Sequence, residues 1–375
     1  MSAYKPYLEF IRYSLNPETE FSLDSTNIDW EGLYHFASEQ AILGVAFEGV
    51  KRLKEKGVKL PIRQLVTWIA AADDIAEQNK KINQAVLRLT TKLKEKGQQT
   101  CILKGQGNNL LYPNVYARTP GDIDVWVKHE GISEKEYIGK VIQYIKKKNH
   151  RGRVTYLHVE IGKIDGIDVE LHIRPSCMNS PIHNRRLQKW FNEQAAAQFG
   201  HEIEGLPDCG PTDCTERICV PTTNFNIVFL LSHIYRHLLI EGIGLRQVID
   251  YFFLLRKAKD ECKMENGELR IMLRYLGLRK IAGAMMWVLK EVLGMEEKYL
   301  IVPPNEKLGI FLLDEIIQGG NFGRYDVRTK HSASRLSRNI ERLQRDVRLV
   351  WYFPSECLWE PVFRIYHFFW RLPYL

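Results

Sequence analysis

Two aspartates, two positions apart, are the residues of this sequence that point most directly to chemistry. Asp122 and Asp124 lie in the segment 121–127, where they alternate with apolar residues. Alternate side chains of a strand face the same way, so the two carboxylates would project from one face. Such a pair repels itself unless a cation lies between its members, and Mg²⁺ prefers carboxylate, water and phosphate oxygens. The pattern therefore favours a magnesium site, with a turn that ends in a solvent-facing Asp124 as the alternative.

A second alternating segment, residues 167–173, carries further polar side chains. Asp168, Glu170 and His172 share one face, and the residues between them are apolar. Acidic residues are uncommon on strands, where a wet face more often carries Thr. If this strand lies beside residues 122–127, one of its acids completes a cluster of three carboxylates, which holds two metal ions for in-line attack on a phosphate. The alternative is a strand that exposes its polar face to solvent.

A glycine turn precedes the aspartates. Residues 103–107 read Leu-Lys-Gly-Gln-Gly, which predicts the end of a strand, a turn and the start of a helix. Glycines let backbone N–H groups approach a phosphate, and a helix N-terminus adds partial positive charge. Lys104 and Arg118 would add formal charge. The turn is therefore a candidate phosphate-binding element.

These residues need a small sheet to hold them together. Short apolar or alternating runs predict strands, and the Asp-Gly pair at 165–166 predicts a hairpin between the last two of them. Residues 133–148 have helical spacing, and a short helix is expected at 108–112. The expected strands are 100–103, 122–127, 153–161 and 166–173. Together they predict an α+β (α/β) core of about 100 residues with a small mixed sheet.

Helical segments flank this core. Apolar residues at helical spacing predict helices over 28–56 and 62–96, the second of which ends at a Lys-Gly pair. Further helices are predicted over 224–238, 248–255, 268–294 and 306–318. We therefore divide the chain into an N-terminal helical region (1–96), a sheet core (97–205) and a C-terminal helical domain (206–375).

The last segment, 351–375, is dense in aromatic residues. Arg364 and Arg371 lie among the aromatics, and the apolar stripe is broad. We expect this segment to pack as core against the helical domain. A surface that forms a homodimer is the alternative.

Composition places the chain among ordinary globular proteins. Its 375 residues carry a net charge of +8, which favours anionic partners such as nucleotides or nucleic acids. No transmembrane run is present, and the first residues do not resemble a signal peptide. Seven cysteines at irregular spacing fit free thiols in the cytoplasm. Cys209, Cys214 and Cys219 recur at regular steps, but an ordinary loop is favoured there over a zinc site.

The order of a glycine turn, an Asp-x-Asp strand and a single acid on a later strand resembles the DNA polymerase β-like nucleotidyltransferase superfamily. Within it, the chain resembles the uncharacterised nucleotidyltransferase family of bacterial proteins. The most specific matching piece is Arg-x-x-Gly-Asp-x-Asp at 118–124. The other matching pieces are residues 103–105, 170–172, 233–237 and 244–247, and Asp250.

The resemblance implies a role for each part of the site. Asp122, Asp124 and Glu170 would hold catalytic Mg²⁺, with two ions expected. The glycine turn would bind a nucleoside triphosphate, with Gly105 and Gly107 against the triphosphate. The nucleotide-binding set is Lys104, Gly105, Gly107 and Arg118.

Further residues are accessory candidates. Asp168 rivals Glu170 as the third acid, and His172 follows on the same strand face. His237 lies on a predicted helix, where a polar contact near the site is favoured over metal binding. Arg246 and Asp250 have the i, i+4 spacing of a helical ion pair. Either that pair forms, or Arg246 reaches a substrate phosphate.

The sequence thus predicts an enzyme that uses Mg²⁺ to transfer a nucleotidyl group from a nucleoside triphosphate to an acceptor. No motif encodes the acceptor, and a small molecule, a sugar, RNA or a protein all fit. The alternative is a catalytically silent nucleotide- or RNA-binding module with this fold, in which the basic surface does the binding.

Overall fold

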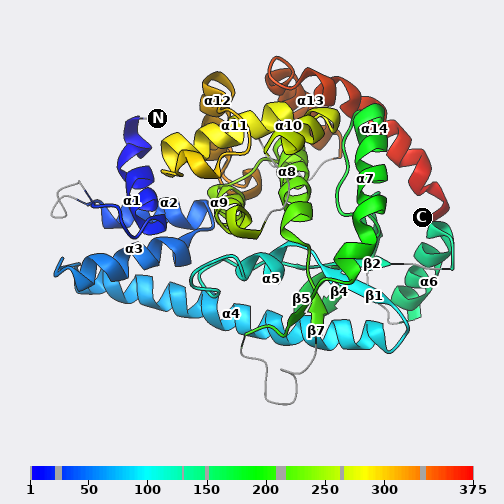
Figure 1. Cartoon of the computed structure of the whole chain (residues 1–375), viewed down its shortest axis with the longest axis horizontal. Coiled ribbons are helices and arrows are strands. Elements are labelled where there is room, and N and C mark those ends of the chain that lie inside the picture. Colours follow the sequence, from blue (N-terminus) through cyan, green and yellow to red (C-terminus); the bar gives the residue numbers. More distant parts are fainter. Residues whose placement is uncertain are drawn as a thin grey trace. The chain divides into compact units, whose positions relative to one another are not determined.

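A computed structural model describes residues 2–21, 28–128, 131–147, 152–207, 217–261, 266–329 and 335–374. The chain forms two compact units, and each is described by itself. The helical unit contains residues 1–77, 111–119 and 237–348, and the sheet unit contains residues 78–110, 120–236 and 349–375. Figure 1 labels the helices and strands of both. The division of the chain into segments 1–96, 97–205 and 206–375 stays a prediction.

The sheet unit is built on a mixed five-stranded sheet with the order β1-β2-β5-β4-β3. β2 and β5 run parallel to each other, and the other neighbours are antiparallel. The strands are β1 (Gln99–Ile102), β2 (Ile123–Lys128), β3 (Arg153–Val154), β4 (His158–Ile164) and β5 (Ile167–His172). A two-stranded ribbon joins β6 (Glu202–Glu204) to β7 (Arg217–Cys219). This mixed sheet among helices confirms the predicted α+β class.

The predicted strands are present with shifted bounds. Residues 153–161 do not form one strand, because β3 ends after two residues and β4 begins at His158. The predicted hairpin between β4 and β5 is confirmed. Asp165 and Gly166 form its turn with φ angles of 52° and 84°, which is the left-handed conformation that Asp-Gly pairs favour.

Helices cover both faces of the sheet. They are the second half of α4 (Ile62–Lys94), α5 (Lys104–Asn109), α6 (Glu134–Lys147), α7 (Pro181–Phe199), the first part of α8 (Thr223–Ile240) and α14 (Pro354–Arg371). Val125 and Leu171 share a core with α4 and α6, which lie on one face (Figure 1). On the opposite face, Trp126 packs against Phe199 of α7 and Phe225 of α8, with ring centroids 4.7 and 5.7 Å apart. Asp124 shares the face of Trp126, because strand residues alternate.

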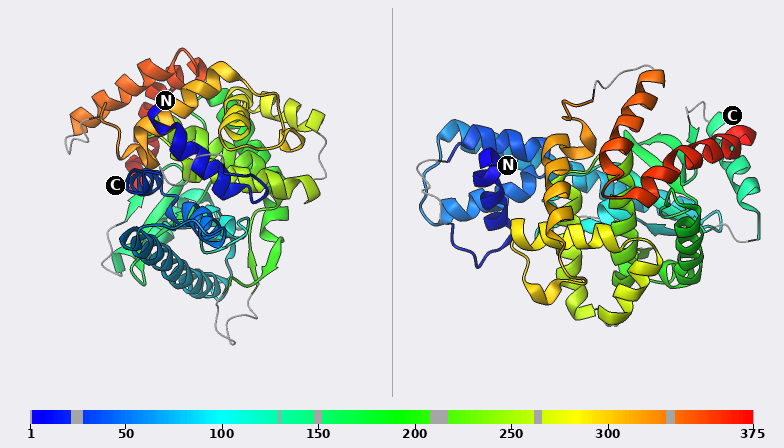
Figure 2. Two further views of the ribbon diagram at one scale, coloured as in Figure 1. Left: turned by 90° about the vertical axis from the view of Figure 1, so that its left-hand side faces the viewer. Right: turned by 90° about the horizontal axis from the view of Figure 1, so that it is seen from above.

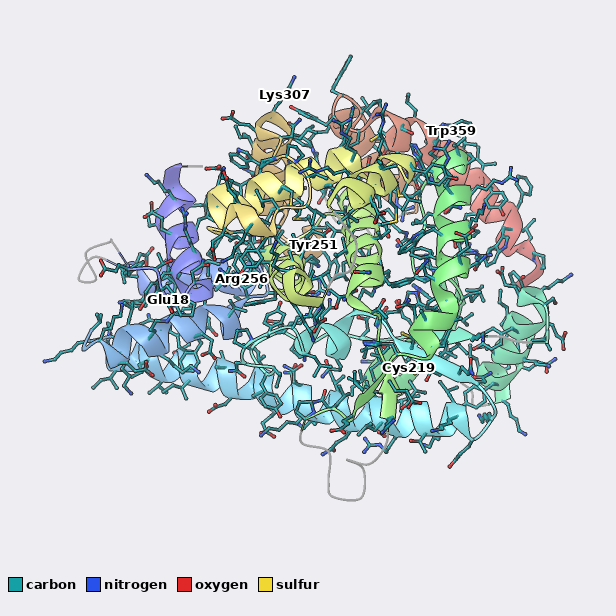
Figure 3. All side chains as sticks on the ribbon, viewed as in Figure 1. Glu18, Cys219, Tyr251, Arg256, Lys307 and Trp359 are labelled. Carbon is teal, nitrogen blue, oxygen red and sulfur yellow. The ribbon has the colours of Figure 1, made fainter. Side chains whose placement is uncertain are left out.

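Helices form most of the helical unit. They are α1 (Lys5–Leu15), α2 (Trp30–Glu39), α3 (Leu43–Glu55), the first half of α4, α9 (Leu245–Glu261), α10 (Asn266–Tyr275), α11 (Arg279–Trp287) with the π-helical turn Val288–Val292, α12 (Glu306–Gly319) and α13 (Arg335–Leu349). Figure 2 shows α1, α2 and α3 packed together, and the ring of Phe36 in α2 lies 5.5 Å from that of Tyr7 in α1. Tyr251, labelled in Figure 3, is fully buried on α9.

The longer predicted helices are present, but two of them are divided. Residues 28–56 form α2 and α3, because Ala41 adopts a φ of 54° and interrupts the helical ladder. Residues 268–294 divide in the same way after Gly277, whose φ is 78°. The helices α1, α7 and α13 have no counterpart in the prediction from sequence.

The aromatic C-terminal segment forms α14, which belongs to the sheet unit. Phe353 packs on Tyr235 of α8, as expected for core packing against a helix. Further along, however, Phe363 and Trp370 lie against Tyr156, which precedes β4, at ring distances of 5.4 and 5.5 Å. The segment therefore packs on the sheet as well as on a helix.

Two other expectations concern membrane-spanning helices and the state of the cysteines. None of the helices in the described part of the chain is long and apolar enough to cross a membrane. Among the described residues, Cys101, Cys177, Cys219 and Cys357 are free thiols. Cys209 and Cys214 lie outside the described residues, so the predicted loop there stays a prediction, whereas Cys219 is the last residue of strand β7 and not part of a loop.

Candidate active site

The parallel pairing of β2 with β5 brings the acids of the two strands together. Asp124 is the direct partner of Glu170 in the register of the two strands. Carboxylate oxygens of Asp122, Asp124 and Glu170 all lie within 4.8 Å of one another. Asp122 precedes β2 and is exposed, whereas Asp124 is 3% exposed. The sheet thus forms a three-carboxylate cluster that is open to solvent on the side of Asp122.

The turn after β1 places a lysine on this cluster. Nζ of Lys104 lies 2.8 Å from Oδ1 of Asp124, and its side chain is 14% exposed. The turn is strained, because Lys104 has a φ of 34° and Gly105 has a φ of 44° inside α5. The N–H group of Leu103 donates to the carbonyl of Asp124 at 3.0 Å and ties the turn to β2. Strain of this kind persists only where the surroundings enforce it, and it often marks a functional site.

Two histidines flank the acids from β4 and β5. Nε2 of His172 lies 2.7 Å from Oδ1 of Asp124 and 3.3 Å from Oε2 of Glu170. Its other ring nitrogen lies 3.2 Å from the carbonyl oxygen of Arg174, an acceptor. Because acceptors face both nitrogens, the ring is best satisfied as an imidazolium that donates on both sides. Nδ1 of His158 lies 2.9 Å from Oε2 of Glu170. His158, Glu170 and His172 form a second cluster that could hold a metal ion.

Charge balance in the cluster shifts the pKa values of its members. The neighbouring charge of Asp124, with partial desolvation, raises the pKa of Asp122 to about 6. Burial opposes ionisation of Asp124, but the Lys104 charge and the His172 hydrogen bond outweigh it and lower its pKa. Burial likewise opposes protonation of His172, but hydrogen bonds to Asp124 and Glu170 raise its pKa to about 9. Asp122 is therefore the acid whose negative charge is least compensated.

Asp168, the alternative third acid, lies outside the carboxylate cluster. The side chain of Asp168 is 66% exposed and lies 3.7 Å from Nζ of Lys163, so the geometry groups Glu170 with the two aspartates instead.

The helix predicted at 108–112 is wrong, because α5 begins at Lys104 and ends at Asn109. Gly107 lies within it, and a Cβ there would be 3.1 Å from the carbonyl oxygen of Ile102. Its lack of a side chain therefore serves the packing of α5 on β1.

Arg118 and Arg246 lie in the helical unit. The guanidinium of Arg118 forms a two-pronged ion pair with Asp250, at 2.8 and 3.0 Å, and Tyr112 donates to the same carboxylate at 2.6 Å. Arg246 donates to the carbonyl of Thr119 at 3.2 Å. Asp250 is thus engaged by Arg118, which lies far from it in sequence, and the expected i, i+4 pair of Arg246 with Asp250 stays a prediction.

His237 is also in the helical unit. Its Nδ1 pairs with Glu241 one turn later in the chain. Its ring packs beside Phe322 at a centroid distance of 5.1 Å. The expected polar contact of His237 near the site stays a prediction, and His237 belongs to neither of the two clusters that could hold a metal ion among the described residues.

Sequence reasoning does not identify His158. Its ring centroid lies 5.0 Å from that of His172, because the two residues are direct partners in the β4–β5 register. The signal was present in the sequence, since His158 and Glu160 alternate with apolar residues as Glu170 and His172 do. The sequence does not reveal the register of β4 and β5, which places the two histidines side by side in the sheet.

Comparison with known proteins gives one match. A family model described as uncharacterised nucleotidyltransferase matches residues 26–294. This range covers more than half of the chain and includes every residue of the two clusters. No curated protein and no solved structure matches the chain.

Proposed function

Because the chain belongs to the uncharacterised nucleotidyltransferase family, we propose that its sheet unit catalyses Mg²⁺-dependent transfer of a nucleotidyl group from a nucleoside triphosphate. The observation that carries this proposal is the three-carboxylate cluster of Asp122, Asp124 and Glu170. Two acids from one strand and a third from its parallel neighbour is the arrangement that phosphoryl-transfer enzymes use to hold metal ions. The acceptor of the nucleotidyl group stays open among small molecules, sugars, RNA and proteins.

The residues present fit Mg²⁺. The cluster offers hard carboxylate oxygens, and Asp122 leaves one side of it open to solvent, so water and phosphate could complete an octahedral shell. The pKa of Asp122, raised to about 6 chiefly by Asp124, shows an electrostatic cost that a divalent cation would remove. Two bound Mg²⁺ ions would activate the acceptor oxygen and neutralise the charge of the pyrophosphate leaving group.

The remaining site residues would position the triphosphate. Lys104 neutralises Asp124 directly, and its ammonium group would become available for a phosphate once a metal ion takes over that carboxylate. Gly105 lies beside Asp122, where a Cβ would be 3.4 Å from the Asp122 carbonyl oxygen, so its bare backbone leaves room for a phosphate. His172, held between Asp124 and Glu170, keeps both carboxylates oriented. Arg118 lies in the helical unit, where it pairs with Asp250, and its role in nucleotide binding stays a proposal.

Calorimetric titration with a non-hydrolysable nucleoside triphosphate tests the proposal. The wild-type protein should bind it in the presence of Mg²⁺ and lose binding on addition of a chelator. Asp124→Asn and Glu170→Gln should each weaken this binding at least about tenfold, because each removes a charged metal ligand. Both changes keep the shape of the side chain and so limit the effect on folding.

Asp168→Asn is the matched control, since Asp168 lies on the same strand but points into solvent. It should bind the nucleotide as the wild type does. Full Mg²⁺-dependent binding by Asp124→Asn would contradict the proposed metal site. Binding of RNA that needs no Mg²⁺ and weakens steeply with salt would favour the catalytically silent module instead.

We also propose that α14 pairs two copies of the chain. Its residues Leu358, Val362, Ile365 and Phe369, with Leu372 directly after the helix, recur at alternating steps of four and three and are 46–67% exposed. Steps of this kind bring side chains to one stripe of a helix, as in coiled coils. Trp359, labelled in Figure 3, borders this α14 stripe and is 40% exposed. An exposed apolar stripe on a helix is self-complementary across a two-fold axis, which favours a second copy as its partner.

A further inference from the structure

A cavity lies on the face of the sheet that is turned away from the acids. Its volume is about 550 Å³, which is within the range of small-molecule sites. Leu171 lines it and lies between Glu170 and His172 in β5. Because strand residues alternate, the side chain of Leu171 points away from the carboxylate cluster. The cavity is therefore a site separate from the acids, although it borders the same strand.

Part of the cavity wall is aliphatic, although Tyr137, Gln98 and Gln99 line the cavity as well. Leu93 comes from α4 and Val141 from α6, while Ile161 and Leu171 come from the sheet. Each of these four side chains is 5–8% exposed. They offer aliphatic carbon and no hydrogen-bonding group, so they favour a hydrocarbon and give a nucleotide base nothing to pair with.

Lysines surround this aliphatic part of the wall. Lys92 and Lys96 come from α4, Lys128 from the end of β2 and Lys140 from α6. No Asp or Glu lines the cavity among the residues that the structure describes. Nζ of Lys96 lies 4.9 Å above the ring of Tyr144, which keeps that charge at the cavity wall. Lys140 also pairs with Glu136 at 3.0 Å, but both side chains are more than half exposed, so the pair holds this lysine only weakly.

We propose that this cavity binds an amphipathic anion, namely a carboxylate or phosphate head group that carries an aliphatic chain. The chain would lie on Leu93, Val141 and Leu171, where burial of its methylene groups would favour binding. The head group would remain near the lysines at the rim. An inorganic anion would leave the aliphatic part of the wall uncovered, and a neutral chain would make no use of the positive charge at the rim. Only a molecule with both parts matches the whole cavity.

Dodecanoate and dodecyl phosphate, used below their micelle-forming concentrations, are suitable probes for calorimetric titration of the full chain. Both should bind, and inorganic phosphate should not. Dodecanol should bind at least about tenfold more weakly, because it lacks the charge that the lysines would contact. Equal affinity for dodecanol and dodecanoate would overturn the proposal, and so would displacement of dodecanoate by ATP.

Vesicles of an anionic phospholipid distinguish a membrane source of this chemistry from a free one. Binding to monomeric dodecanoate without binding to vesicles supports a ligand that is taken up from solution. Binding to both supports a single amphiphile drawn from a bilayer. Binding to vesicles alone would overturn the cavity as the site, since the basic surface would then account for it.

Substitutions locate the site. Lys92→Met combined with Lys128→Met should weaken dodecanoate binding at least about tenfold. Lys94→Met combined with Lys135→Met is the matched control, since these exposed lysines lie on α4 and α6 but do not line the cavity. The control should bind as the wild type does. Equal weakening in both double variants would show a diffuse charge effect and overturn the assignment.

A second variant tests the apolar part. Val141→Trp would fill the cavity and should abolish dodecanoate binding. Its thermal unfolding should be compared with that of the wild type to show that the variant is folded. The double lysine variant decides the question independently if it is not.

Discussion

Nζ of Lys104 lies 2.8 Å from Oδ1 of Asp124, and the two side chains are 14% and 2% exposed. A cation that belongs to the protein thus already occupies one oxygen of the carboxylate cluster. A divalent metal ion that binds Asp124 must compete with it. The lysine would therefore weaken the binding of metal alone and become available for a phosphate when metal and nucleotide bind together.

Lys104→Met should reveal this competition. With the ammonium group gone, Mn²⁺ or Mg²⁺ alone should bind more tightly, by about tenfold or 1.4 kcal/mol. Binding of the nucleotide with Mg²⁺ should weaken at the same time. Calorimetric titrations with metal and with metal plus nucleotide measure both effects.

Lys163→Met is the control for that experiment, because Lys163 faces Asp168 on the same sheet but outside the cluster. It should change neither affinity. Weaker binding of metal alone by Lys104→Met would show that the lysine supports the metal site, contrary to the competition inferred here.

His172 should make stability fall at alkaline pH. Its pKa is raised from 6.5 to about 9 by hydrogen bonds to Asp124 and Glu170, against the effect of burial. A group whose pKa is raised on folding stabilises the protein fully below its unfolded pKa, and this contribution is lost as the pH rises through the folded one. The free energy of unfolding should therefore fall by about 2–3 kcal/mol between pH 6.5 and 9.5.

Urea unfolding of the metal-free protein across that pH range measures the effect. His172→Gln retains a hydrogen-bond donor but cannot titrate, so its stability should vary much less over the same range. A variant curve with the slope of the wild type would mean that other groups cause the loss.

The alternation of polar and apolar residues is enough to predict β2, β5 and the shared face of their acids. Asp122 directly precedes β2, Asp124 lies in β2 and Glu170 lies in β5. The apolar residues beside them in these strands must be buried. The Asp-Gly turn likewise encodes its own conformation, because few other pairs adopt positive φ at both positions. These are local properties, and a local pattern is sufficient to specify them.

The register of β4 is not encoded in the same way. Next to the hairpin turn, Lys163 pairs with Asp168. The register then shifts between Lys163 and Glu160, and as a result His158 pairs with His172. Without that shift, His158 would lie opposite residue 173 and point to the other face. Gly162, with a φ of 85°, lies in the irregularity and is its only signal in the sequence.

Pairing over long sequence distances is equally invisible to local patterns. Arg118 and Asp250 are 132 residues apart, and only the folded chain shows that they meet. The i, i+4 spacing of Arg246 and Asp250 predicts a partner on the same helix, and nothing in that spacing indicates that the Asp250 carboxylate also binds Arg118. The i, i+4 rule states which contacts are possible within one helix. It does not state which partners the rest of the fold brings to the same side chain.

The Arg118–Asp250 pair should stabilise the helical unit. Its side chains are 7% and 5% exposed, so removal of one partner deprives a buried charge of its two-pronged ion pair. Arg118→Met and Asp250→Asn should each lower the free energy of unfolding by about 3–5 kcal/mol, and the double variant by less than the sum. Urea unfolding of the three variants measures the coupling.

The same variants distinguish support from substrate binding. If Arg118 acts only through Asp250, both single variants should weaken nucleotide binding to a similar extent. Strong loss of nucleotide binding in Arg118→Met with unchanged stability would instead place its guanidinium on the substrate.

The α14 stripe should control association of the chain with itself. Ile365, at the middle of the stripe, is 61% exposed, and a glutamate there would put two negative charges close together in a paired helix. Ile365→Glu should raise the dissociation constant of the dimer at least about tenfold, as measured by sedimentation equilibrium. Ile182→Glu is the matched control, because Ile182 is 60% exposed on α7, outside the stripe. It should leave the dimer intact. A wild-type protein that stays monomeric at high micromolar concentration would exclude this pairing, and equal dissociation by both glutamates would place the interface elsewhere than on α14.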